Sequence, residues 1–106
     1  MDEMPLVITA PIKFDGTNAK DVGDQLRAAL GRRSMVIADL TQTWTCDLSA
    51  IGELFLAHDQ AARSGRELRI VVSSAALMHE FVLARLDTEL QIYPSVSLAS
   101  QAAAHV

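Results

Sequence analysis

The chain has 106 residues, which suits one domain and leaves little room for a second. Half of its residues are hydrophobic and 21% are charged, a balance typical of a compact protein rather than a disordered one. Its 9 basic and 13 acidic side chains give a net charge of −4, which argues against nucleic acid or an anionic membrane as partner. No apolar run is long enough to span a membrane, and the acidic start MDEMP is unlike a secretory signal, so we expect a cytoplasmic location.

The first third of the chain predicts a strand, a turn and a helix. The run LVITA at residues 6–10 predicts a strand, followed by a short extended piece at 11–14 and a turn at Asp15-Gly16. Thr17 or Asn18 can cap the next helix, and Gly31 follows where a left-handed residue is wanted. The apolar spacing gives this helix an inward stripe of Ala19, Val22, Leu26, Ala29 and Leu30.

The rest of the chain alternates strands and helices. Two uniformly apolar strands are expected at 35–40 and 67–72, both covered on two faces, and a last strand near 90–93. A helix is expected from about Leu48 to Arg63, ended by Ser64-Gly65, with a second one capped by Ser73 or Ser74. Ser95 or Ser97 can cap a closing helix, SLASQAAA. The predicted inward stripes are Ile51, Leu54, Phe55, His58 and Ala62 in the first helix and Leu77, Phe81 and Ala84 in the second.

This order predicts an α/β fold in one domain over residues 1–106. We expect a central, mostly parallel mixed β-sheet with about four helices packed on it. Gly23 and Gly52 fall inside predicted helices, where glycine costs about 1 kcal/mol relative to alanine, so each is expected to permit close packing.

The residues give no sign of catalysis. A lone cysteine, Cys46, excludes an internal disulfide and cannot provide a thiolate zinc site. His58 is expected about 18 Å further along the helix, far beyond hydrogen-bond reach of that thiol. No HExxH, CxxC or phosphate-binding glycine loop occurs. We therefore expect no enzymatic activity, no cofactor and no metal.

The segment from Met35 to Leu56, MVIADLTQTWTCDLSAIGELFL, combines a buried strand, a polar turn and an aspartate that opens an apolar helix. It resembles the signature segment of the STAS family, shared by bacterial anti-sigma factor antagonists and sulfate-transporter tails. The run ARSGRELRIVV from Ala62 to Val72 and the closing IYPS are further points of similarity. The resemblance covers nearly the whole chain and implies the STAS arrangement of strands and helices.

The family motif after the strand is close to D-S-S-G, and its first serine is phosphorylated by a partner kinase. The matching residues here are Asp47, Leu48, Ser49 and Ala50, so the phosphoacceptor position holds a leucine without a hydroxyl. Three interpretations stay open: Leu48 is an unswitched apolar contact, the switch has moved to Ser49 (less plausibly Thr45), or this signalling has been abandoned. The Ser49 side chain points about 100° away from that of Leu48 around the helix, so a kinase shaped for the usual position would not simply accept it.

The resemblance implies a partner-binding surface at the start of this helix. Asp47 is expected to cap the helix as well, and Trp44 either closes over the sheet edge or stands exposed as an interface anchor. Leu48, Ile51 and Trp44 also suggest that homo-oligomers can form. The predicted partner-binding residues are Trp44, Thr45, Asp47, Leu48, Ser49, Ala50 and Glu53.

The function that this resemblance implies is regulation by protein–protein contact. We expect an anti-sigma factor antagonist-like regulator that binds a kinase-type anti-sigma factor and is not switched by phosphorylation at the usual position. One alternative is a STAS subunit that binds the ATPase of a lipid-transport ABC transporter. A second alternative is a signalling scaffold that binds a small ligand or nucleotide at the same surface.

Overall fold

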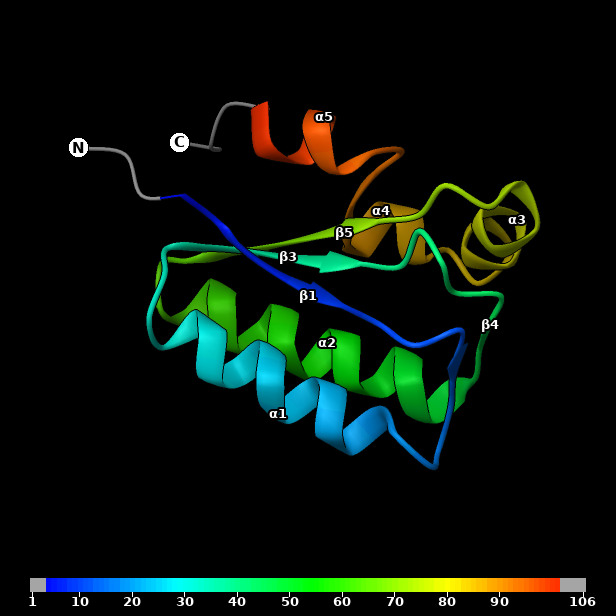
Figure 1. Ribbon diagram of the computed structural model, residues 1–106, viewed down its shortest axis with the longest axis horizontal. Helices are drawn as coiled ribbons and strands as arrows, with labels where there is room; N and C mark the ends of the chain where they lie inside the picture. The colour runs from blue at the N-terminus through cyan, green and yellow to red at the C-terminus, as the bar shows by residue number, and fades with distance from the viewer. Residues whose placement is uncertain (1–3, 102–106) are drawn as a thin grey trace.

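A parallel four-stranded sheet forms the centre of the computed structural model, which describes residues 4–101 (Figure 1). Its strand order is β1-β3-β5-β6, and a separate parallel pair, β2 with β4, lies at one end of the molecule. The predicted α/β class is confirmed. All strand pairs in the described residues are parallel, so the mixed sheet that we expected is not found there. The strands are β1 (Leu6–Thr9), β2 (Lys13–Phe14), β3 (Met35–Asp39), β4 (Thr45–Cys46), β5 (Glu67–Val71) and β6 (Gln91–Tyr93).

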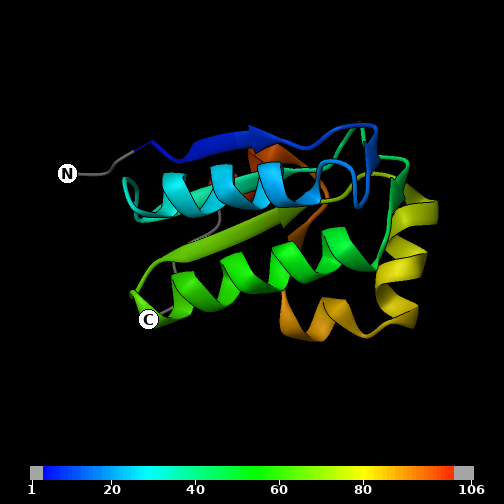
Figure 2. The same ribbon diagram turned by 90° about the horizontal axis from the view of Figure 1, so that it is seen from below.

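Helices cover both faces of this sheet (Figures 1 and 2). The long helices α1 (Ala19–Leu30) and α2 (Leu48–Arg63) lie side by side on one face, and α5 (Val96–Gln101) lies on the other. The helix α3 (Ala75–Leu83) and the single turn α4 (Leu86–Glu89) follow beside α2. Five helices therefore occur in residues 4–101 where about four were expected, because the turn α4 was not predicted.

The two-sided cover explains the uniformly apolar strands. The central residues of β3 and β5 are buried, as their sequence predicted. The inward stripe predicted for α1 is confirmed at all five positions. The stripe of α2 is rotated from the prediction: Leu54 is buried, but Ala62 is exposed. Alanines were poor guides there because they pack well on either face; the buried set of α2 is Ala50, Leu54, Ala57 and Ala61.

Several local predictions were wrong at helix ends. Gly31 has φ −74°, so it is not the left-handed residue that we expected after α1. Among the described residues, positive φ occurs at Gly65 and at Arg85, which joins α3 to α4. Ala84, predicted to point inward, is exposed because α3 ends one residue before it. The closing helix ends at Gln101, and the rest of its predicted length lies outside the described residues.

A buried arginine attaches α5 to the sheet. The Arg69 side chain is fully buried within β5, a position that the apolar run ELRIVV did not single out. Its guanidinium donates to the Ala99 carbonyl at 2.6 Å, pairs with the Glu67 carboxylate at 2.9 Å and lies over the Tyr93 ring. A buried charge requires such partners, so this cluster is expected to hold α5 in place.

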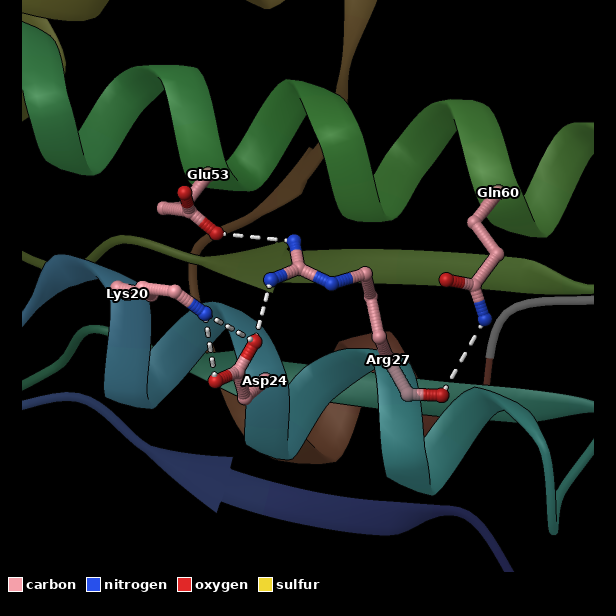
Figure 3. A network of polar contacts seen from close by, with 5 residues as sticks. All are labelled: Lys20, Asp24, Arg27, Glu53 and Gln60. Atoms are coloured by element: carbon pink, nitrogen blue, oxygen red, sulfur yellow. Dashed lines mark hydrogen bonds and ion pairs between the residues drawn. The ribbon is translucent and has the colours of Figure 1, made fainter.

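Polar contacts, shown in Figure 3, and one small residue, Gly23, allow α1 and α2 to lie close together. A Cβ added to Gly23 would lie 1.9 Å from Glu53 Oε1, so the glycine makes room for that carboxylate. Arg27 Nη1 donates to the same Glu53 oxygen at 2.9 Å, and Gln60 Nε2 donates to the Arg27 carbonyl at 3.2 Å. The packing role predicted for Gly23 is therefore confirmed. The one predicted for Gly52 was wrong, because a Cβ there would meet nothing within 4 Å.

Candidate protein-docking surface

The polar turn after β3 is held by the chain segment that precedes α1. The buried Thr43 hydroxyl donates to the Pro11 carbonyl at 2.9 Å, and the Trp44 amide donates to the Ile12 carbonyl at 2.8 Å. These bonds place β4 beside β2, although 32 residues separate Thr43 from Pro11 in the chain. In this turn the Thr43 side chain is buried, and the Trp44 side chain is exposed.

Asp47 caps α2 and fastens a second loop to it. Its Oδ1 accepts a hydrogen bond from the Ala50 amide at 3.0 Å, which confirms the predicted N-cap. Its Oδ2 accepts a bond from the Gly16 amide at 3.1 Å, so the loop before α1 is tied to the first turn of α2. Both carboxylate oxygens thus serve the fold.

Large apolar side chains stand in solvent around this cap. Leu48 is 85% exposed and Trp44 is 79% exposed, so the tryptophan does not close over the sheet edge. Thr45 and Ser49 are exposed beside them in the chain. We call Ile12, Trp44, Thr45, Leu48 and Ser49 the docking surface.

Ile12 was missed by the sequence interpretation. It is 55% exposed, and its carbonyl accepts bonds from both the Trp44 and Thr45 amides, which places it next to Trp44. Nothing in the sequence next to Ile12, an extended residue after a proline, indicates that its side chain is exposed beside Trp44. The pairing of β2 with β4, which brings it there, is a long-range contact that the pattern of a single strand cannot predict.

Two of the predicted partner-binding residues face the interior. The Ala50 side chain is fully buried in the core beneath α2, so the prediction that it contacts a partner was wrong. The Glu53 carboxylate is held by Arg27, and its side chain is 18% exposed between α1 and α2. The helix turns Leu48 and Ser49 outward, and the same rotation turns Ala50 and Glu53 toward α1 and the core.

A shallow cavity of about 260 Å³ adjoins the docking surface. It lies where the carboxyl ends of β3 and β5 lead into their loops, a usual position for crevices in parallel sheets. Trp44 forms one wall, and threonine and serine residues form most of the rest. The Ser74 hydroxyl is not free there, because it caps α3 by accepting from the Leu77 amide at 3.1 Å. The lining residues are Thr41, Thr43, Trp44, Ser73, Ser74 and Ala76.

Cys46 is a poor nucleophile in this setting. Burial raises the pKa of its thiol to about 12, with further contributions from the neighbouring charges of Asp47 and Glu80. The thiol therefore stays protonated near neutral pH, and a thiolate is needed for attack. Within residues 4–101, no group of three or more His, Cys, Asp or Glu side chains is arranged to hold a metal ion. In the same range, no helix has the length and apolarity needed to cross a membrane.

Comparisons with known proteins address the family directly. The model of the STAS domain matches residues 2–99, which is nearly the whole chain. The chain belongs to the STAS domain family. No curated protein matches it.

A solved structure shares the fold of this chain. A Thermotoga maritima protein, described as a candidate anti-sigma factor antagonist, superimposes with a TM-score of 0.76 over 88% of this chain and 83% of its own. The two sequences are 20% identical, so this likeness concerns the fold. It agrees with the expected order of strands and helices in this STAS domain.

Proposed function

We propose that this STAS domain is a non-enzymatic, cytoplasmic regulator that acts as an anti-sigma factor antagonist by binding a protein partner through the docking surface. The proposal rests mainly on the exposure of Leu48 and Trp44 near the start of α2. The Asp47 carboxylate at that helix start is already occupied by hydrogen bonds within the fold. Exposed large apolar residues that lie together often mark protein–protein interfaces, and tryptophan is enriched among the residues that dominate binding energy.

The proposed partner is a kinase-type anti-sigma factor, as the family resemblance implies. The position that such a kinase would phosphorylate holds Leu48. We therefore expect this chain to stay bound under conditions in which a chain with serine there would be phosphorylated and released. In this proposal Leu48 inserts into an apolar pocket of the partner, and burial of a leucine side chain stabilises a complex by about 1.5–3 kcal/mol before binding costs.

A displaced switch at Ser49 fits the geometry less well. A Cβ added to Gly16 would lie 3.5 Å from Ser49 Oγ, so the hydroxyl is next to the loop that Asp47 holds. A phosphate on Ser49 would bring about two negative charges close to the Asp47 carboxylate, which is unfavourable. We therefore favour an unswitched docking surface over phosphorylation of Ser49.

Affinity capture of the tagged chain from its native cytosol tests this proposal. We expect a kinase-type anti-sigma factor among the captured proteins, and no phosphate on this chain by mass spectrometry. Capture of a transporter ATPase in its place would support a role in a lipid-transport ABC complex and contradict the proposal. Phosphate on Ser49 or Thr45 would contradict the unswitched surface.

The substitution Leu48→Ser gives a second test with the same partner. It restores a hydroxyl at the first residue of α2, directly after the Asp47 cap, where the side chain is exposed and not packed in the core. We expect the kinase to phosphorylate this variant and then to release it, and to leave the unchanged chain unmodified. A partner that binds the serine variant tightly and never phosphorylates it would contradict the kinase assignment.

A further inference from the structure

A groove lies between α1 and α2 at the end of the molecule opposite the docking surface. It has a volume of about 460 Å³, within the usual range of ligand-sized sites. Leu56 is 54% exposed in it and forms an apolar wall about two turns before Arg63 on the same face of α2. Gln60 joins the two helices across its floor through the Arg27 carbonyl (Figure 3). The lining residues are Arg27, Leu56, Gln60, Arg63 and Ser64.

Two arginines, Arg27 and Arg63, line this groove, and more arginines lie at the same end of the two helices. Arg32 and Arg33 follow the last turn of α1, and Arg63 and Arg66 flank the end of α2. The two helix ends lie side by side in both views of the ribbon (Figures 1 and 2). The basic end, as we call it, thus holds Arg27, Arg32, Arg33, Arg63 and Arg66, more than half of the 9 basic residues.

Only one of these five arginines forms ion pairs within the described residues. Arg27 is occupied by Asp24 at 2.7 Å and Glu53 at 2.9 Å. Within residues 4–101, no ion pair is formed by Arg32, Arg33, Arg63 or Arg66. Asp59 and Glu67 are the acidic residues closest in sequence to Arg63 and Arg66, and Glu67 is paired with Arg69.

Helix dipoles do not account for so many arginines. A cation in the last turn is favourable for each helix, and Arg27 and Arg63 meet that need for α1 and α2. Arg32 and Arg66 lie beyond the helix ends, so they add positive potential to this end of the molecule.

We propose that the α1/α2 groove binds an acidic peptide segment of a second protein partner. An aliphatic or aromatic side chain of the segment would pack on Leu56, and carboxylates on either side of it would pair with Arg63 and with the neighbouring Arg66 or Arg32. The apolar wall inside a positive rim is complementary to an apolar residue flanked by acids. This site is separate from the docking surface and does not rest on the function proposed for it.

The groove favours a peptide over a long polyanion. Nucleic acids and anionic membranes bind through many phosphates spread along a surface, and the net charge of −4 opposes that mode. Here most of the positive charge lies at one end of the molecule, beside a largely apolar groove that a hydrated phosphate backbone would leave unfilled.

The test is a titration of the full chain with a synthetic amphipathic peptide of glutamate and leucine, followed by backbone amide NMR and calorimetry. We expect chemical-shift changes at the ends of α1 and α2 and no change in the fluorescence of Trp44, which lies on the docking surface. Arg63→Glu should weaken binding by about tenfold or more, whereas Lys13→Glu, with the same charge change on β2, should alter it by less than about twofold. Leu56→Ser should also weaken binding, and Arg63→Lys should largely retain it.

The remaining outcomes overturn the proposal. Equal binding of a peptide with serine in place of leucine would show that charge alone acts and that the apolar wall has no role. Binding of phosphatidylglycerol vesicles or duplex DNA, lost in Arg63→Glu, without peptide binding would assign the basic end to a polyanion. A mass that grows with concentration and depends on Arg63 would make a second copy of the chain the occupant. Circular dichroism of each variant excludes loss of folding as the cause.

Discussion

The two ends of α2 use the same kinds of side chain in opposite ways. At the first end, the Asp47 carboxylate makes hydrogen bonds within the fold, and the apolar side chains of Leu48 and of the preceding Trp44 are exposed. Toward the other end, the apolar residues Ala57 and Ala61 are buried, and the terminal Arg63 is exposed. The first end of α2 therefore exposes large apolar side chains of the kind that usually lie in a core. Such exposure is expected of a binding surface and not of residues that stabilise the fold.

The largest difference in stability is expected between substitutions of two leucines in α2, one buried in the core and one exposed on the docking surface. Leu54→Ala removes a fully buried side chain and should lower the free energy of unfolding by about 2–5 kcal/mol. Leu48→Ala removes an exposed one and should change it by no more than about 0.5 kcal/mol. Urea denaturation of both variants measures the difference. Similar losses would mean that Leu48 is part of the core in solution.

The Asp47 cap comes next. Asp47→Ala leaves the Ala50 and Gly16 amides without their acceptor and should cost about 1–2 kcal/mol of stability. Asp47→Asn keeps an oxygen for the cap and should cost less. Urea denaturation measures both changes. An alanine variant as stable as the unchanged chain would mean that Asp47 is free for a partner and is not needed by the fold.

The close approach of α1 and α2 gives a smaller effect. Gly23→Ala should destabilise by about 1 kcal/mol, because the overpacking against Glu53 outweighs the better helix propensity of alanine. Combining it with Glu53→Ala removes the obstruction, so the two changes should be strongly non-additive in a double-mutant cycle. If the losses of unfolding free energy were additive, the destabilisation by Gly23→Ala would not come from contact with Glu53.

The smallest effect concerns the loop that Asp47 holds. Hydrogen bonds from the Thr17 hydroxyl and amide keep the pKa of Asp15 below its ordinary value. The stabilisation from this lowered pKa is fully present above the unfolded value, near about pH 4, and is lost as the pH falls through the lower folded value. Thr17→Ala should raise the pKa of Asp15 toward normal in an NMR titration. An unchanged pKa would assign the shift to another cause.

Local signals in the sequence predicted much of the frame on which the docking surface stands. The bounds of α2 were predicted from its apolar spacing, the Asp47 cap and the Ser64-Gly65 stop, and the structure confirms them. Ser74 and Ser95 cap α3 and α5 through their hydroxyls, as predicted. Such features depend on residues within one turn of each other, so a single sequence contains the necessary information.

Features that depend on distant partners were missed. The exposure of Ile12 depends on the pairing of β2 with β4, and the burial of Arg69 depends on Glu67 and on Ala99, 30 residues away. The inward face of α2 was misjudged because its many alanines give little contrast between faces. Whether Glu53 faced a partner or α1 depended on Gly23 and Arg27 in another helix.

The most direct test of the docking surface is the affinity of two matched variants for a kinase-type anti-sigma factor, measured by calorimetry. Leu83 on α3 is 70% exposed and provides the control for Leu48. We expect Leu48→Asp to weaken binding by about 30-fold or more, which corresponds to about 2 kcal/mol, and Leu83→Asp to leave it nearly unchanged. Equal affinities of the two variants, with both folded, would contradict the assignment of the docking surface to the first turn of α2.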